Sequence, residues 1–277
     1  MATAKVEFGD FQTPLGLARH VCQVLRQTGV SGRSLVEPTC GIGNFLLAAS
    51  EAFPESRGWG YEVNDRYVKM AAAAVAEGDS RVTVRQANFF NVDWKSEFSR
   101  LEEPILVVGN PPWVTNAAVG ALGGANLQKK VNSQRLRGIE AITGKSNFDV
   151  SEWMLLALGD ALIGREATLA VLVKEAVARK VLSRWWGRGD AISDARIYPI
   201  DALREFGASV AACLFVCRFH AAETSLECRA FSDLDGETPI RTIGYRDGRV
   251  VADTAAYDRW RHLTRSGSSS VAIGHQT

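Results

Sequence analysis

Four consecutive residues, Asn110-Pro111-Pro112-Trp113, have the clearest chemical potential in the sequence. They follow an apolar run typical of a buried strand, and open α/β sheets bind ligands at the carboxyl ends of their strands. Proline lacks an N–H and fixes its own φ, so the carbonyl groups of Asn110 and Pro111 are held outside any helix. A planar amine lying against Trp113 would donate to the Asn110 side-chain oxygen and to the Pro111 carbonyl. This arrangement suits the attack of a conjugated amine on an electrophilic methyl group.

Taken alone, the tetrapeptide suits an ordinary Pro-Pro turn equally well, but further candidates lie at the ends of three earlier strands. Segment 37–45 is a strand-to-helix turn with two glycines, which let a ligand approach the backbone closely. Its first residue, Glu37, is placed to meet a cationic amino group. Glu62 ends the next strand, about 20 residues beyond the turn, where an acid accepts ribose hydroxyls. Asn88 and Phe89 then offer an amide for a purine edge and a ring for its face.

The elements that must position these residues alternate between strand and helix patterns, which indicates a parallel sheet covered on both faces. Strands are expected at 34–37, 58–62, 81–86, 105–108, 167–173, 195–198 and 210–219. Helices are expected at 15–28, 44–52, 65–76, 150–162, 176–186 and 254–263, with two or three short strands before the last helix. Segment 115–144 has weak periodicity and is expected to form a long, functional loop.

The composition limits the class of protein. At 46% hydrophobic and 23% charged residues the chain is ordinarily globular. Its longest apolar stretch, near 210–217, is too short to cross a bilayer, and the first residues lack the apolar core of a signal peptide. Five cysteines form no CxxC pair and the histidines lie far apart, so we expect no metal site and reduced thiols in a cytoplasmic protein.

The formal net charge of +1 is uninformative, but its distribution is uneven. Residues 126–219 carry 14 basic and 10 acidic side chains, and they include two basic runs that contain no acid. The first run lies at 129–137, and the second lies at 179–188, where it is interleaved with Trp185 and Trp186. These runs are modest evidence for phosphate contact, because a charged run is more often only a solvated face.

In this order, the motifs resemble those of N6-adenine DNA methyltransferases that use S-adenosylmethionine, in the group whose cofactor motifs precede the catalytic motif. The resemblance covers residues 8–219, and its specific parts are 8–14, 37–45 and 110–113. Segment 145–149 is similar to a further cofactor-side motif. The resemblance implies a Rossmann-like class I methyltransferase fold with a mostly parallel seven-stranded sheet in residues 1–220. Residues 221–265 would form a small appendage or begin a recognition region, and 266–277 a flexible tail.

The resemblance also implies roles for single residues. It places the following in contact with the cofactor: Thr13, Pro14, Glu37, Pro38, Cys40, Gly41, Gly43, Asn44, Glu62, Val63, Asn88, Phe89 and Asn110. Asn110, Pro111, Pro112 and Trp113 would form the catalytic motif, with Phe206 against the displaced base. The chain departs from the family in two places, since Asp is commoner than Asn88 and Tyr or Phe is commoner than Trp113.

The implied substrate is an adenine rotated out of double-stranded DNA, because its N6 atom is inaccessible inside the duplex. Trp113 and Phe206 would sandwich the base, each stack contributing about 1–3 kcal/mol. The expected phosphate contacts are Lys129, Lys130, Arg135, Arg137, Lys145, Arg179, Lys180 and Arg184. The residues after 219 are too few for the usual recognition domain, so we expect a partner chain or a downstream segment to read the DNA sequence.

Alternatives remain open at this stage. Similar Asn-Pro-Pro-aromatic motifs occur in enzymes that methylate adenine in RNA or the side-chain amide of glutamine in proteins. The motif at 8–14 and the long basic segment favour DNA. An inactive binding or specificity subunit is the alternative of another class, but both motifs that such copies usually lose are intact here. The role in restriction and modification of DNA is part of the same expectation.

Overall fold

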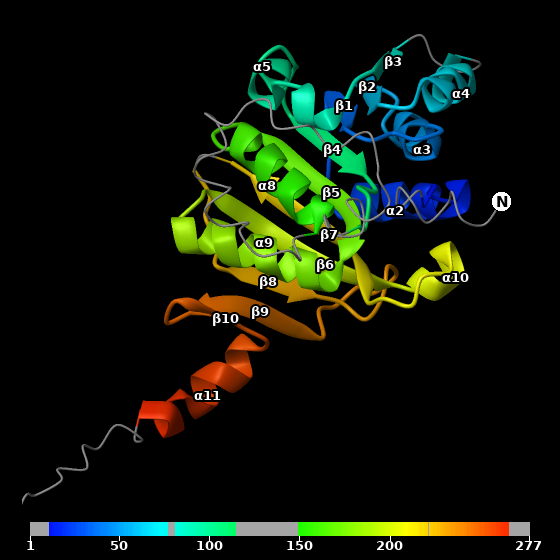
Figure 1. Ribbon diagram of the computed structural model, residues 1–277. Helices are drawn as coiled ribbons and strands as arrows, with labels where there is room; N and C mark the ends of the chain where they lie inside the picture. Colours follow the sequence, from blue (N-terminus) through cyan, green and yellow to red (C-terminus); the bar gives the residue numbers. More distant parts are fainter. Residues whose placement is uncertain (1–10, 77–80, 115–148, 221, 266–277) are drawn as a thin grey trace, which may run out of the picture.

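One mixed sheet organises the part of the chain that the computed structural model describes, which is residues 11–76, 81–114, 149–220 and 222–265 (Figure 1). Its strands are β1 (Ser34–Glu37), β2 (Arg57–Glu62), β3 (Val82–Gln86), β4 (Ile105–Gly109), β5 (Ala167–Lys174), β6 (Ile192–Ile200), β7 (Ala212–Phe219), β8 (Glu227–Ala230), β9 (Arg241–Arg246) and β10 (Arg249–Val251). They lie in the order β10-β9-β8-β6-β7-β5-β4-β1-β2-β3.

The order of the strands reverses between β1 and β4. The chain builds β1, β2 and β3 outward in one direction, then returns to add β4 on the other side of β1 and β5 beyond it. These five strands are all parallel, so their carboxyl ends lie at one edge of the sheet. Ligands of open α/β sheets bind outside this edge at the point of reversal, which here lies between β1 and β4.

Helices cover both faces of the sheet because side chains alternate between the faces along each strand. The helices are α2 (Leu15–Gln27), α3 (Asn44–Ala52), α4 (Asp65–Ala76), the 3-10 turn η1 (Phe89–Asn91), α5 (Trp94–Phe98), α8 (Val150–Leu162), α9 (Glu175–Arg188), α10 (Ala202–Phe206) and α11 (Thr254–Arg265). One core lies between the sheet and α2 and α3, through residues such as Leu106. The other lies under α5, α8 and α9, through residues such as Val107, and Figure 1 shows α8 and α9 in front of the strands.

The expected elements are confirmed in order and nearly in their bounds, with two kinds of correction. The short helices α5 and α10 were not expected, because five residues carry too little periodicity to identify a helix. In the described residues the sheet has ten strands rather than the expected seven. Strands β8, β9 and β10 join the edge of β6 and extend the same sheet, and β8 pairs with β6 in parallel. Every helix in the described residues is too short or too polar to span a membrane.

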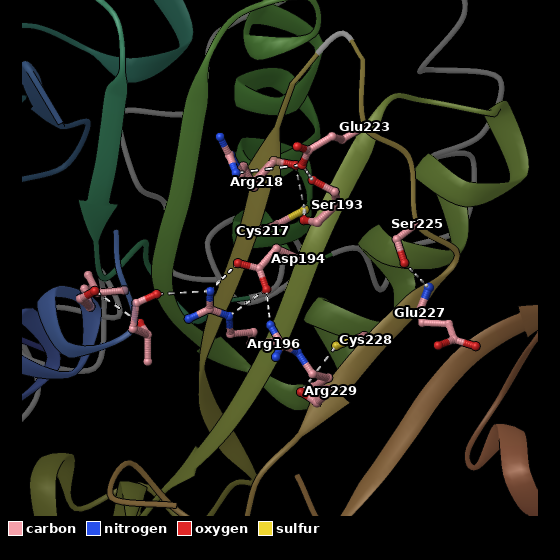
Figure 2. A network of polar contacts seen from close by, with 12 residues as sticks. Ser193, Asp194, Arg196, Cys217, Arg218, Glu223, Ser225, Glu227, Cys228 and Arg229 are labelled. Carbon is pink, nitrogen blue, oxygen red and sulfur yellow. Dashed lines mark hydrogen bonds and ion pairs between the residues drawn. The ribbon is translucent and has the colours of Figure 1, made fainter. Parts of the chain in front are cut away.

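A polar network at a bulge in β6 joins the extension to the rest of the sheet (Figure 2). Asp194 has a positive φ of 47°, and its carboxylate accepts from both Arg196 and Arg229, the latter on β8. Arg196 also donates to the carbonyl of Thr28 at the end of α2, over 3.4 Å. Burial alone raises the pKa of Asp194, but the two guanidinium groups outweigh it and lower that pKa. The network therefore ties β6, β8 and α2 together at the edge opposite the carboxyl ends.

The packing of α8 against α9 depends on a helical glycine. A Cβ atom at Gly159 would lie 2.5 Å from Cζ2 of Trp185, whose side chain is fully buried. We expect Gly159→Ala to reduce the free energy of unfolding by about 1–3 kcal/mol, the usual effect of overpacking a core. Gly16 on α2 is the matched control, because a Cβ there has no neighbour within 4 Å. Urea unfolding should show Gly16→Ala unchanged or slightly more stable, and equal effects of both variants would contradict this account.

Candidate active site

The acids and amides expected from the sequence gather at the carboxyl edge, around the reversal point. Glu37 ends β1, Glu62 ends the neighbouring β2, and Asn110 directly follows β4 on the other side of β1. The residues are far apart in sequence, and parallel pairing alone brings them to one edge. The geometry of each group then shows what it can bind.

The turn between β1 and α3 is shaped by two glycines that no other residue could replace without movement. Gly41 has φ +51° and Gly43 has φ +88°. A Cβ atom on Gly41 would lie 2.3 Å from Oε1 of Gln12, and one on Gly43 would lie 2.9 Å from the Cβ of Ala71 on α4. Gln12 in turn accepts from the backbone N–H of Ile42 over 3.0 Å. The turn is therefore clamped between α4 and the segment that precedes α2.

Glu62 holds the same turn from the side of β2. Its carboxylate is buried and accepts from the backbone N–H of Gly41 over 2.9 Å and from that of Asn64 over 2.8 Å. A carboxylate has about four lone-pair sites and can accept several hydrogen bonds at once, which suits it to the hydroxyls of a ligand. The acid thus fixes the glycine turn and faces the same site.

Glu37 is an acid buried without full compensation. It is 3% exposed, and its Oε2 atom has no hydrogen-bond partner among the described residues. Burial raises the pKa of Glu37 well above its ordinary value, and the nearby negative charge of Glu62 raises this pKa further. A cationic amino group bound next to Glu37 would supply the missing partner and reverse the shift.

Asn110 presents the acceptor that the sequence predicts. Its Nδ2 atom donates to the backbone carbonyl of Phe11 over 3.1 Å. Its Oδ1 atom is buried, and no donor among the described residues lies within hydrogen-bond distance of it. Buried polar atoms are nearly always paired, so such an atom at a sheet's ligand edge needs an explanation. A donor from a bound substrate provides one.

Aromatic rings close the site beside Asn110, but they do not leave the expected gap. The ring centroids of Trp113 and Phe206 are 5.1 Å apart in an edge-to-face contact, so no base lies between them in this arrangement. Phe11 completes the cluster at 5.8 Å from Trp113 and 6.0 Å from Phe206. Trp113 is buried and donates from Nε1 to the carbonyl of Leu172 on β5. The expected sandwich would require Phe206 to move, because Trp113 is anchored.

The purine contacts expected at Asn88 and Phe89 are also altered. Asn88 caps η1, and its Oδ1 atom accepts from the N–H of Phe90. Its amide nitrogen and the second lone pair of Oδ1 could serve a ligand edge. Phe89 is 5% exposed and belongs to the core under α5 and α8. The neighbouring Phe90 is 40% exposed and packs against Trp153 of α8, at 4.9 Å between centroids. The exposed ring is therefore Phe90, a residue that the motif alone did not single out.

The remaining cofactor candidates fall into three groups. Thr13 and Asn44 hold each other, since Asn44 Nδ2 donates to the Thr13 carbonyl over 2.9 Å. Pro14 precedes α2, Pro38 follows β1, and Val63 follows β2 with 44% of its surface exposed. The Cys40 thiol is buried, with Sγ 3.1 Å from where a Cβ on Gly60 would lie, and burial raises its pKa. Only the backbone of Cys40 is therefore positioned to contact a ligand.

The basic helix α9 differs from the expected free cationic face. Lys180 and Arg184 lie 3.5 and 3.6 Å from the carboxylate of Glu152, a buried acid on α8. Arg179 binds Glu175 on its own helix, at 2.7 Å. Trp185 and Trp186 lie in the core. The sequence run contains no acid, but folding brings acids from α8 and from the start of α9, so phosphates would compete with carboxylates for these cations.

Several expected site residues lie outside the described part of the chain. These are residues 8–10 of the first motif, the expected loop 115–144, the cations Lys129, Lys130, Arg135, Arg137 and Lys145, and the expected tail 266–277. Asp149, the last residue of the motif at 145–149, is described. It caps α8 by accepting from Ser151, and it forms an ion pair with Lys174 at the end of β5, at 2.8 Å.

Comparison with known proteins yields one family and several structural relatives. A model of the N-6 DNA methylase family matches residues 1–180. The chain is 40% identical over 267 residues to the type II methyltransferase M.NspV from a Nostoc species. That alignment covers 96% of this chain and 55% of the relative, so the chain spans about half the length of the curated relative that it matches.

Two solved structures share the fold. One is a protein from Listeria monocytogenes assigned to the class I S-adenosylmethionine-dependent methyltransferases, with TM-score 0.57 and 13% identity, covering 81% of this chain and 67% of that one. The other is a modification subunit assigned to a type I restriction enzyme from Vibrio vulnificus, with TM-score 0.51 and 13% identity, covering 94% of this chain and 54% of that one. Both likenesses confirm the class I methyltransferase fold expected from the sequence.

The raised pKa of Glu37 gives a prediction for the ligand-free protein. The unfolded chain loses the Glu37 proton near pH 4.5, whereas the folded protein keeps it to a higher pH. This group therefore costs stability as the pH rises from about 4.5 toward its folded-state pKa. We expect Glu37→Gln to remove this loss and to raise the free energy of unfolding at pH 8 by about 1–3 kcal/mol, the usual cost of an unsatisfied buried group.

Urea unfolding at pH 5 and pH 8 measures this effect. Glu51→Gln on α3 is the control, because Glu51 is exposed and its ion pair with Arg19 lowers its pKa. The control should keep the pH dependence of the wild-type protein between these two values. The same pH dependence in Glu37→Gln would show that Glu37 is not the source of it.

Proposed function

The chain belongs to the N-6 DNA methylase family, and from that premise we propose that it transfers a methyl group from S-adenosylmethionine to the N6 amine of an adenine in DNA. The observation that carries the proposal is the buried Oδ1 atom of Asn110, which lacks a donor among the described residues. An adenine amine rotated out of the duplex would supply that donor.

The residues at the carboxyl edge suit S-adenosylmethionine. This cofactor has a cationic amino group, two ribose hydroxyls and a purine ring, and it supplies a methyl group on a positively charged sulfur. Glu37 offers a buried carboxylate oxygen without a partner among the described residues. Glu62 offers a buried carboxylate to the ribose hydroxyls, and Asn88 and the exposed ring of Phe90 lie at the end of the neighbouring strand β3.

The chain's own residues act on the acceptor. The N6 lone pair of adenine is conjugated with the ring, so the nitrogen becomes nucleophilic only when its two protons are drawn into hydrogen bonds and it can pyramidalise. Asn110 Oδ1 and the Pro111 carbonyl are neutral oxygens that would accept hydrogen bonds from the two N–H groups. The N6 lone pair would form the new N–C bond while the electron pair of the broken methyl–sulfur bond stays on sulfur, and the methylated nitrogen, then positively charged, would release one proton to water. No side chain with a tuned pKa is required, and the rate comes from in-line positioning of the nitrogen and the methyl group.

Adenine in DNA is the acceptor that the comparisons favour over RNA or glutamine. The matched family is named for DNA methylation, and the relative with 40% identity is a type II methyltransferase. We therefore propose a role in restriction and modification of DNA, in the cytoplasm. We further propose that a partner chain or a downstream segment reads the DNA sequence. In support, the described residues after β7 extend the sheet, and the cations of α9 are paired with acids.

Transfer of labelled methyl groups from S-adenosylmethionine to DNA of mixed sequence, followed by mapping of the modified adenines, tests the proposed function. We expect Asn110→Ala to slow transfer by about 10²–10³-fold, as when one preorganised group is removed from a transition-state site. The loss should appear in kcat, while the affinity for the cofactor stays nearly unchanged. Equal losses of transfer and cofactor affinity would contradict the assigned role. If methyl groups were transferred only to RNA or only to protein, DNA would not be the acceptor.

Glu62→Ala should have the reverse effect. Removal of the carboxylate takes away the charged acceptor of the ribose hydroxyls and frees the N–H of Gly41. We expect the affinity for S-adenosylmethionine to fall by about 1.5–3 kcal/mol, as for charge-assisted hydrogen bonds. Calorimetric titration of the wild-type protein, Glu62→Ala and Asn110→Ala separates the two sides of the site. An unchanged affinity in Glu62→Ala would remove this residue from the cofactor site.

A further inference from the structure

We propose that Phe11 is a positioning residue, which holds the Asn110 amide in the one orientation that presents its oxygen to the acceptor amine. This inference rests on the proposed function, because it concerns the same reaction. It differs from the role that the sequence motif implies for its neighbour Thr13, which is contact with the cofactor. Phe11 would act on the acceptor side of the site, through Asn110.

The Asn110 amide can adopt two orientations, which exchange the positions of its oxygen and its nitrogen. The oxygen and nitrogen ends of an asparagine side chain have nearly the same size, so only hydrogen bonds decide which end points where. The carbonyl of Phe11 can only accept, and it lies 3.1 Å from Asn110 Nδ2. A flipped amide would set two oxygens against each other at Phe11 and turn an N–H donor toward the amine. The bond to Phe11 therefore keeps the Oδ1 atom as the acceptor.

The Phe11 carbonyl is itself held from two sides. Its ring packs against Trp113, at 5.8 Å between centroids, and against Phe206, at 6.0 Å. The next two residues are bonded to the glycine turn, Gln12 through Ile42 N–H and Thr13 through Asn44 Nδ2. Trp113 follows Asn110 by three positions and is anchored on β5 by its own hydrogen bond. The ring of Phe11 thus fixes its carbonyl to the segment that carries Asn110.

Single-turnover methyl transfer by Phe11 variants tests the proposal. We expect Phe11→Ala to slow transfer at least about tenfold, because small misplacements of catalytic groups have effects of this size or larger. Phe11→Tyr keeps the ring and should restore the rate to within about threefold of wild type, as packing requires only the ring. Cofactor affinity, measured by calorimetry, should stay within about threefold in both variants. Melting temperatures report whether each variant folds.

The Asn110→Ala background separates positioning from a general structural effect. Alanine has no side-chain amide to orient, so a residue that acts only through that amide has nothing left to position. Adding Phe11→Ala to Asn110→Ala should then cause less than about a twofold further loss of the residual rate, since the two effects should not add when one residue acts through the other. Two results would each overturn the proposal: a wild-type rate in Phe11→Ala, or equal slowing by Phe11→Ala in the wild-type and Asn110→Ala backgrounds.

The orientation can also be read without any activity. The side-chain NH2 signal of Asn110 in a ¹⁵N-labelled protein is identified by its absence from the Asn110→Asp spectrum. Its exchange with water should be slow in the wild-type protein and in Phe11→Tyr, and fast in Phe11→Ala. If the wild-type protein transferred no methyl group to DNA, the proposed function would fail. The exchange measurement would still test positioning by Phe11. Faster exchange of the Asn110 NH2 group in Phe11→Ala supports it, and unchanged exchange contradicts it.

Discussion

Two buried acceptors without donors dominate the physical chemistry of this molecule. The Oε2 atom of Glu37 and the Oδ1 atom of Asn110 both lie at the reversal point of the sheet, and neither has a partner among the described residues. An unpaired buried polar atom costs about 1–3 kcal/mol, so a fold carries such atoms only if the surrounding structure holds them in place. One is a carboxylate and the other a neutral amide oxygen. The pair therefore divides the site into a part for a cation and a part for a neutral donor.

Close contacts hold the structure around these two atoms in place. Glu62 and Gln12 accept from two successive backbone N–H groups of the glycine turn, and Ala71 of α4 leaves no room for a side chain on Gly43. The segment of residues 11–13 crosses the carboxyl edge and bonds to both the glycine turn and Asn110. The same short segment thus fixes the distance between the cofactor side and the acceptor side. The in-line transfer proposed above would depend on that distance.

Many of the cationic side chains in the described residues are paired with nearby acids. Three cations of α9 pair with Glu152 and Glu175, and the carboxylate of Asp194 accepts from Arg196 and Arg229 at the edge opposite the carboxyl ends. The pairing of the α9 cations with acids lowers the attraction of this helix for phosphates. Attraction of DNA by this helix would require phosphates to displace acids that are already bound.

The sequence determined the fold class and indicated most of the candidate site residues, because both follow from local patterns. Alternating strand and helix patterns give the order of the elements, and a glycine turn, Glu62 and Asn110 mark the ends of successive strands. Only the tertiary structure decided how these residues meet. It buried Phe89 and exposed Phe90, brought the rings of Trp113 and Phe206 into contact, and set acids against the basic run of α9. It also placed β8, β9 and β10 in the main sheet and brought the Phe11 carbonyl to Asn110. These contacts join residues distant in sequence, and their distances depend on packing, which no local pattern encodes.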